Sequence, residues 1–215
     1  KLNISGWNMA VPNAFNTSLL QLERGSRDDR WMIGGMVVRQ DRLMNGGNKA
    51  DSLAYFQHDA SMAISGRLRM NLGRFRWQAN YTRITADGRY LMPREWGRDP
   101  FYTFLPRERN EGHGDVHAAT INLIWRTKSG WRIQADAGQY WLPAISNVQL
   151  NKYALPAYQQ YDVNVQYQFK GNWKGLAAQF IYLMKLPMPD AIYTTRQAVN
   201  KVDMHHAELI INYAF

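Results

Sequence analysis

Arginines flank two short turns of this sequence, and their spacing suggests a chemistry. Arg67 and Arg69 precede the turn NLGR and Arg76 follows it, so we expect Arg69 to lie opposite Arg76 in a hairpin. Around the turn TKSG, we expect Arg126 to lie opposite Arg132. Like charges directly opposite each other destabilise a sheet, so stability alone would rarely place them there twice. A guanidinium group keeps its charge and binds a carboxylate through a planar fork, so these arginines are expected to attract small carboxylates.

The segment 87–114 combines many charged and aromatic residues with three prolines. A solvated loop has little need for so many aromatic side chains, and loops longer than about 15 residues are usually functional or disordered. Two arrangements stay open: a loop that folds inward or over the mouth and narrows a pore, or an outward lid packed on neighbouring loops by salt bridges. For the first, the candidate residues are Arg94, Trp96, Arg98, Tyr102, Arg107 and Arg109.

Strands must position these side chains, because apolar and polar residues alternate with a period of two along most of the chain. In RFRWQANYT, for example, Phe75 and Trp77 alternate with Arg76. Such segments recur about ten times, and no helical periodicity extends beyond two turns. The stretch WMIGGMVVRQ is ambiguous, and in GLAAQFIYLMK the residues Ile181 and Leu183 fall on the polar face.

The connections between the strands alternate in length as well. Short turns at 24–29, 71–74, 127–130 and 170–175 take turns with long loops at about 42–57, 87–114, 142–157 and 187–202. The first hairpin is expected to be joined by AVPNAFNT. Short turns at one end, long loops at the other and one apolar face are typical of an outer-membrane barrel. We therefore predict an all-β fold, a transmembrane antiparallel β-barrel, as a single domain over 1–215.

A barrel in a membrane turns its apolar face to lipid and its polar face to a watery lumen. The five arginines then line the pore, together with Asp136, Asp162 and Glu208. The arginines either attract solutes or pair with these acids or with lipopolysaccharide groups near the rim, and a register error of one residue would turn them all outward. At the short-turn rim we expect a girdle of aromatic residues: Phe75, Trp125, Trp131, Phe169, Tyr213 and Phe215.

A soluble β-sandwich or a lipocalin-like binding protein is one alternative, because its strands alternate too. Its apolar face is the inner one, and it needs neither an aromatic rim nor connections of alternating length. Trp77, Leu123 and Val165 separate the two folds. They face lipid in a membrane barrel and lie in a dry interior in a soluble one.

Composition narrows the functions further. The 215 residues carry a net charge of +9, a mean hydropathy of −0.48 and no cysteine, which excludes disulfides and thiol chemistry. His113 and His117 are four residues apart, which suits a helix rather than a strand, so we predict no metal site and no cofactor. Aromatic side chains and arginines lie on opposite faces, so a nucleic-acid platform is not expected. A barrel enzyme of the lipase or protease type remains an alternative, although no serine motif accompanies His205 and His206.

Three stretches, PREWGRDPFYTFLPRERNEG, QDRLMNGGN and NKVDMHHAELIINYAF, resemble the OprD family of Gram-negative outer-membrane porins. The resemblance spans most of the chain. It implies a monomeric barrel of about eighteen strands in contact with outer-membrane lipid and lipopolysaccharide. It also implies inward-folded loops that form a constriction, and a ladder of arginines for passive uptake of amino acids, aromatic acids and other small carboxylates. The ladder candidates are Arg67, Arg69, Arg76, Arg126 and Arg132.

About ten strands are little more than half of such a barrel. On the resemblance, the chain is expected to be the C-terminal part of a longer one. The alternative is a small barrel, whose narrow lumen would be filled largely by side chains.

Overall fold

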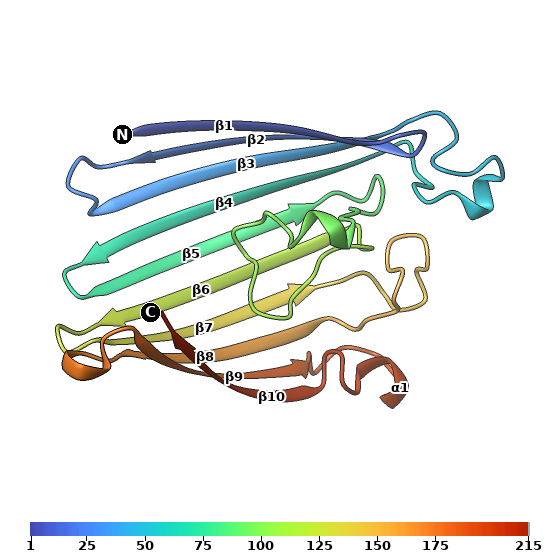
Figure 1. The fold of residues 1–215 in the computed structure, drawn as a ribbon. Coiled ribbons are helices and arrows are strands. Elements are labelled where there is room, and N and C mark those ends of the chain that lie inside the picture. Colours follow the sequence, from blue (N-terminus) through green and yellow to red (C-terminus); the bar gives the residue numbers. More distant parts are fainter. Residues whose placement is uncertain (215) are drawn as a thin grey trace.

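The computed structural model describes residues 1–214, and for Arg94 it describes the backbone without the side chain. Phe215, which was predicted to join the aromatic girdle, therefore lies outside the described residues. Within them the chain forms one antiparallel sheet of ten strands in sequence order, as predicted (Figure 1). The strands are β1 (Leu2–Val11), β2 (Phe15–Gly25), β3 (Trp31–Arg42), β4 (Ala60–Leu72), β5 (Phe75–Ile84), β6 (Val116–Arg126), β7 (Trp131–Trp141), β8 (Tyr158–Gln168), β9 (Leu176–Pro187) and β10 (Met204–Tyr213).

Helices in the described residues are short: α1 (Thr195–Ala198) and three 3-10 turns, Asp51–Leu53, Arg94–Trp96 and Gly171–Trp173. None of them has the length and apolarity needed to cross a bilayer. The connection 85–115 between β5 and β6, called the inner loop below, lies in front of the sheet in Figure 1, where β10 also crosses in front of its neighbours. Among the described residues, β1 pairs only with β2 and β10 only with β9, so the sheet has two free edges.

The connections alternate as predicted except at the first hairpin. Strand β1 continues to Val11 and β2 begins at Phe15, so only residues 12–14 join them instead of the eight of AVPNAFNT. Asn13 takes a left-handed φ of 60°, and the Ala14 amide donates to the Val11 carbonyl at 3.0 Å. Asn tolerates that conformation, so a tight turn suffices where a long loop was expected.

The β4–β5 hairpin has a register two residues away from the predicted one. Its two-residue loop is Gly73–Arg74 rather than Leu72–Gly73, and Gly73 at the first loop position has a φ of 63°. Such tight turns require a positive φ and favour glycine. As a result Arg76 faces Asn71 and Arg69 faces Gln78, so the predicted Arg69–Arg76 pair is wrong. A shift of two residues keeps every side chain on its predicted face.

The outer face of the sheet is apolar and exposed from β1 to β10. Trp77 pairs with Leu123 in one cross-strand row, and Val165 continues the same face on β8. Leu123 is 51% exposed. A soluble barrel would bury this face, whereas a membrane barrel presents it to lipid.

Aromatic side chains gather at the short-turn end of that outer face. The Phe75 and Trp125 rings stack with centroids 6.2 Å apart, and the Trp131 and Tyr167 rings lie 4.6 Å apart. Phe169 contacts Tyr167 edge-on at 4.8 Å. Tyr213 on β10 is also exposed. Amphipathic rings are favoured at the level of lipid headgroups, so the predicted girdle has the expected position for these residues.

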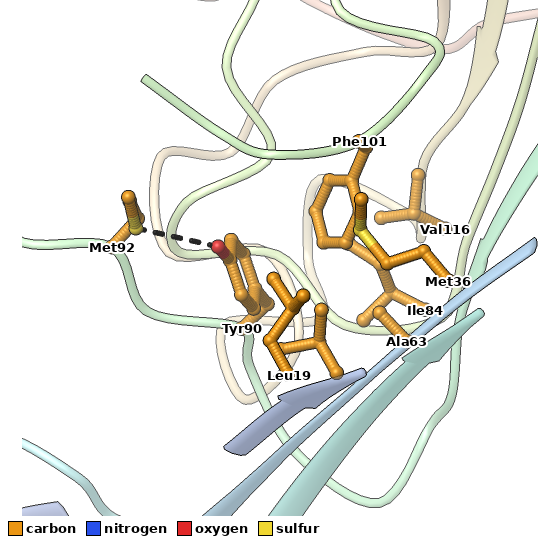
Figure 2. Packing of buried hydrophobic residues seen from close by; sticks show 9 residues of the cluster. Leu19, Met36, Ala63, Ile84, Tyr90, Met92, Phe101 and Val116 are labelled. Atoms are coloured by element: carbon orange, nitrogen blue, oxygen red, sulfur yellow. Dashed lines mark hydrogen bonds between the residues drawn. The ribbon is translucent and has the colours of Figure 1, made fainter. Parts of the chain in front are cut away.

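The inner face is not polar throughout, contrary to the prediction. Towards the long-loop end it carries an apolar cluster of strand residues covered by Tyr90, Met92 and Phe101 of the inner loop (Figure 2). Met36 and Val38 of β3 belong to this cluster, while other apolar residues of β3 face outward. Strand β3 is therefore apolar on both faces, which explains why WMIGGMVVRQ was ambiguous.

Candidate pore lining and constriction

Arginines gather on the inner face at the short-turn half of the sheet. Arg67 and Arg69 come from β4, Arg76 from β5, Arg126 from β6 and Arg132 from β7. The register sets Arg126 directly opposite Arg132, as predicted. All five share the face of the sheet that carries the inner loop. Four neighbouring strands, β4 to β7, therefore each contribute at least one arginine to the inner face.

The arginines differ in how far their charge is neutralised. Arg67 forms an ion pair with Glu23, and Arg69 forms one with Asp29 at 2.5 Å. Arg76 donates from Nε to the Asn71 side-chain oxygen at 2.8 Å. Arg132 donates to the neutral Gln134 amide. Cation character is therefore strongest at β5–β7, where the partners of the guanidinium groups are amides.

Asp136 does not neutralise an arginine through an ion pair. Its carboxylate accepts from the Asn122 side-chain amide at 2.7 Å and from Gln134 Nε2 at 2.7 Å. Asn122 in turn accepts from Asn80 Nδ2 at 2.8 Å. These inward residues form a chain of hydrogen bonds across β5, β6 and β7, which holds the carboxylate with neutral donors.

Asp162 and Glu208 also lie on the inner face without an arginine partner among the described residues. Gln160 Nε2 donates to the Asp162 carboxylate at 3.0 Å. Glu208 lies 3.7 Å from His206 Nε2. The alternative in which the arginines pair with Asp136, Asp162 and Glu208 is therefore wrong in the described part of the chain. The acids that pair are Glu23 and Asp29, at the start of the sheet.

The inner loop lies against the inner face, which is the first of the two arrangements left open by the sequence. Thr103 Oγ1 lies 2.8 Å from Thr82 Oγ1 on β5, and Tyr140 on β7 donates to the Thr103 carbonyl at 2.9 Å. Gln160 on β8 donates to the Pro106 carbonyl at 2.7 Å. The loop therefore crosses the sheet from β5 to β8 on the side of the arginines.

Tyr102 contacts strands on the other side of the loop, β2 and β4. Its amide donates to Ser65 Oγ at 3.1 Å, and its hydroxyl donates to Glu23 Oε1 at 3.1 Å. The Arg67 guanidinium lies over its ring, 4.2 Å from the centroid. Burial, followed by the nearby Glu23 carboxylate, raises the pKa of Tyr102 to about 12, so the phenol stays protonated and continues to donate.

The other predicted loop residues make contacts within the loop and with the wall, while the side chains of Arg98 and Arg107 are exposed. Trp96 packs against Phe15 with ring centroids 5.8 Å apart, and Arg98 lies 5.3 Å from the Phe104 ring centroid. Arg109 donates to the Met92 carbonyl. The Arg107 carbonyl accepts from Lys185 Nζ at 2.6 Å. Arg94, the sixth predicted residue, has a side chain outside the described part of the structure.

Two carboxyl groups of the inner loop itself are buried. Burial raises the pKa of Asp99 to about 6, against which the Asn110 amide donates to Asp99 Oδ2 at 2.5 Å. Burial also raises the pKa of Glu108 well above its usual value, and Asp99 adds to the shift. Neither Glu108 oxygen has a hydrogen-bond partner in the described residues. These groups favour the protonated carboxyl while the loop is docked.

Sequence reasoning missed several residues of this wall. Glu23 and Gly34 share a row with Arg67, and neither was a candidate. Lys185 was missed because β9 fitted the alternating pattern poorly, although Leu183 and Lys185 occupy one face in the observed register. A usable signal existed for Glu23, since it alternates with outward Leu20 and Leu22 in the same strand, but its distant partner Arg67 was not visible in the sequence.

Solved structures share this fold over nearly the whole chain. OccK3 (OpdO) of Pseudomonas aeruginosa has a TM-score of 0.76 and 12% identity over 99% of this chain and 52% of its own. OpdK of the same organism, crystallised with vanillate, has a TM-score of 0.69 and 12% identity over 99% and 52%. OccAB3 of Acinetobacter baumannii has a TM-score of 0.72 and 11% identity over 100% and 52%.

The chain therefore has the fold of β-barrels of the OprD/Occ porin type, and it spans about half the length of those solved chains. The resemblance found in the sequence is confirmed at the level of the fold. No protein-family model matches the sequence, and no curated protein matches it.

Proposed function

We propose that this chain forms part of the wall of an outer-membrane porin that takes up small carboxylate-bearing solutes passively. Residues 1–215 act as one domain of a monomeric barrel, whose remaining wall pairs with the free edges of β1 and β10. The outer face contacts lipid and lipopolysaccharide. The inner face lines the pore, and the chain is a channel rather than an enzyme.

The observation that carries this proposal is the division of side chains between the two faces. Leu123, Val163 and their neighbours are exposed on one face, while Arg126 and Arg132 lie on the other. Hydrocarbon favours the first face, and a watery lumen favours the second. The similar fold of the OprD/Occ barrels supports the membrane location.

Solute class follows from the arginines. Within the described residues, no carboxylate forms an ion pair with Arg76, Arg126 or Arg132. Their guanidinium groups therefore remain available to a passing anion. A row of cations in a narrow tube raises the local concentration of anions. OpdK was crystallised with vanillate, which carries a carboxylate on an aromatic ring, and its fold supports the same class here.

The inner loop forms the constriction in this proposal. It crosses the wall between β5 and β8 and holds Tyr102 beside Arg67. A solute that passes the loop would meet cations at Arg76, Arg126 and Arg132. Selectivity then combines the width left by the loop with the charge of the wall.

Ion selectivity tests the proposal. The full-length protein is inserted into a planar bilayer under a potassium chloride gradient, and the reversal potential is measured. The expected result is anion selectivity that decreases when benzoate competes for the pore. A channel that prefers potassium, or a protein that forms no channel, would refute the proposal.

A further inference from the structure

The wall carries a three-residue row in which the middle position has no side chain. Glu23 pairs with Gly34 on β3, and Gly34 pairs with Arg67 on β4. All three positions face inward. Glu23 and Arg67 therefore reach toward each other across Gly34, where they form an ion pair.

Tyr102 fills the space that the glycine leaves. A Cβ atom built on Gly34 would lie 2.8 Å from the Tyr102 hydroxyl oxygen and 3.1 Å from the adjoining ring carbon. Both distances are too short for an ordinary contact. The neighbouring Gly35 faces the other side of the sheet, and a Cβ there would meet no atom within 4 Å. The absence of a side chain at Gly34 is thus matched to the tyrosine of the loop.

Glu23 holds both groups at once. Its Oε1 atom accepts from the Tyr102 hydroxyl and from the Arg67 guanidinium, and the guanidinium also stacks on the tyrosine ring. The two charged side chains are only partly solvated, with 21% of Arg67 and 13% of Glu23 exposed. Arg67 Nε has no partner among the described residues, so one donor of its fork is unused. Glu23 is the one carboxylate paired with Arg67 in the described residues, and a solute must displace it to bind this largely buried fork.

We propose that Glu23, Gly34, Arg67 and Tyr102 form a latch that holds the inner loop against the wall, and that a carboxylate solute opens it by replacing Glu23 on Arg67. This inference rests on the proposed function and adds regulation to it. Glu23 acts as an internal carboxylate that competes with the solute. Once Arg67 binds the solute, Glu23 loses its cation and Tyr102 loses the stacked guanidinium.

Release would act on the segment around Tyr102, because other ties of the loop remain, such as the bonds between Leu91 and Gln40 on β3. Thr103 still bonds to Thr82 and Tyr140 when Tyr102 leaves. The segment around Tyr102 would therefore move away from Glu23 and Ser65 while the loop stays attached at β3, β5 and β7. That movement would widen the passage beside Arg67 when a carboxylate is present.

A cysteine reporter tests the latch without relying on conductance. The chain contains no cysteine, so Ser65→Cys introduces a single thiol at a buried position on β4, directly beneath Tyr102. The rate at which a water-soluble maleimide labels this thiol in the full-length protein reports loop opening. Benzoate serves as the carboxylate probe, and benzamide is a neutral control of similar shape.

We expect benzoate to raise the labelling rate at least threefold and benzamide to leave it unchanged. Glu23→Gln and Gly34→Ala, each combined with the reporter, should label fast without any solute and should not respond to benzoate. Asp41→Asn, which removes an acid from the outer face, and Gly35→Ala are the matched controls and should behave like the parent.

An unchanged rate in the parent with benzoate, or a preserved benzoate response in Glu23→Gln, would overturn the latch. Bilayer recordings on the same samples separate this result from the proposed function. Anion-selective conductance without a labelling response removes only the latch. A parent that does not conduct removes the proposed function, and the latch with it.

Discussion

Arg126 lies directly opposite Arg132 across the β6–β7 hairpin, with both side chains on the inner face of the sheet. Arg132 bonds to the neutral Gln134, and neither guanidinium forms an ion pair within the described residues. Facing like charges cost stability, and the Asp136 carboxylate attracts Arg132 without forming an ion pair with it. A pair of arginines that costs stability in this way is expected where the two cations attract an anionic solute in the pore.

Replacing one member of the pair should therefore change stability and selectivity in opposite directions. Arg126→Gln removes the repulsion and is expected to raise the free energy of unfolding by about 0.2–1 kcal/mol. It should also lower the anion-to-cation permeability ratio. Urea unfolding in detergent and reversal potentials measure the two effects. Arg24→Gln, on the outer face of β2, is the charge-matched control and should leave the permeability ratio unchanged; a fall in selectivity there would contradict this assignment.

The Thr82–Thr103 hydrogen bond ties the inner loop to β5, and both side chains are fully buried. Thr82→Val keeps the shape but leaves the Thr103 hydroxyl without this partner, which should destabilise the docked loop by about 1–3 kcal/mol. The double variant Thr82→Val/Thr103→Val removes both hydroxyls and should cost less than the sum of the single changes. Rates of trypsin cleavage within the loop report docking. Strictly additive effects would show that the bond does not hold the loop.

Loop docking should depend on pH through Asp99. Burial raises its pKa to about 6 from the usual 3.8, although the Asn110 amide and Arg109 oppose the shift. The docked loop therefore binds a proton more tightly than the released loop. Docking is favoured below about pH 4 and loses this contribution as pH rises through 6.

The variant Asp99→Asn isolates that contribution. It should dock more tightly than the parent above pH 6, by on the order of 3 kcal/mol at most, and this advantage should vanish toward pH 4. Comparing the two proteins at each pH cancels other groups, such as His113, whose pKa burial lowers to about 4. Proteolysis of the loop between pH 4 and 8 gives the difference, with exposed Asp87→Asn as the control. A difference that does not vary with pH would contradict the role of Asp99.

Much of the fold could be predicted from the sequence because alternation with a period of two marks both faces of a membrane barrel. The positions of Trp77, Leu123 and Val165 followed from this pattern, and so did the facing arginines Arg126 and Arg132. The register of β4–β5 did not, because the sequence does not specify whether the two-residue loop of this hairpin is Leu72–Gly73 or Gly73–Arg74. An error of two residues leaves the faces intact but changes every partner.

The inner loop could be predicted only as a candidate. Its aromatic residues indicated a folded segment, but its direction depends on contacts with strands far away in the chain. Met36 and Val38 of β3 are covered by it, and this apolar patch on a nominally polar face was the one local sign of an inward loop. The role of Gly34 could not be predicted, because the need for a glycine at this position becomes visible only once Tyr102 is placed above it.

Two adjacent residues of β9 allow the faces to be compared at one depth. Phe180 lies on the outer face and Ile181 on the inner face, opposite Glu208 of β10. Phe180→Arg should cost about 2–4 kcal/mol, because the bilayer midplane disfavours a cation, and should reduce membrane assembly. Ile181→Arg should be tolerated, since the charge meets water and Glu208. Heat-modifiable mobility of the folded protein on gels measures assembly, and equal losses in both variants would argue against opposite environments.

The central claim is that one face of this sheet meets lipid and the other meets water. The most direct measurement attaches nitroxide spin labels, one at a time, at Val163, Asn164, Val165 and Gln166 of β8 in the full-length, bilayer-embedded protein. Each label is then tested for collisions with oxygen, which partitions into lipid, and with a nickel chelate, which stays in water. We predict that oxygen reaches the labels at 163 and 165 and that the chelate reaches those at 164 and 166. The opposite phase, or no alternation at all, would contradict the account.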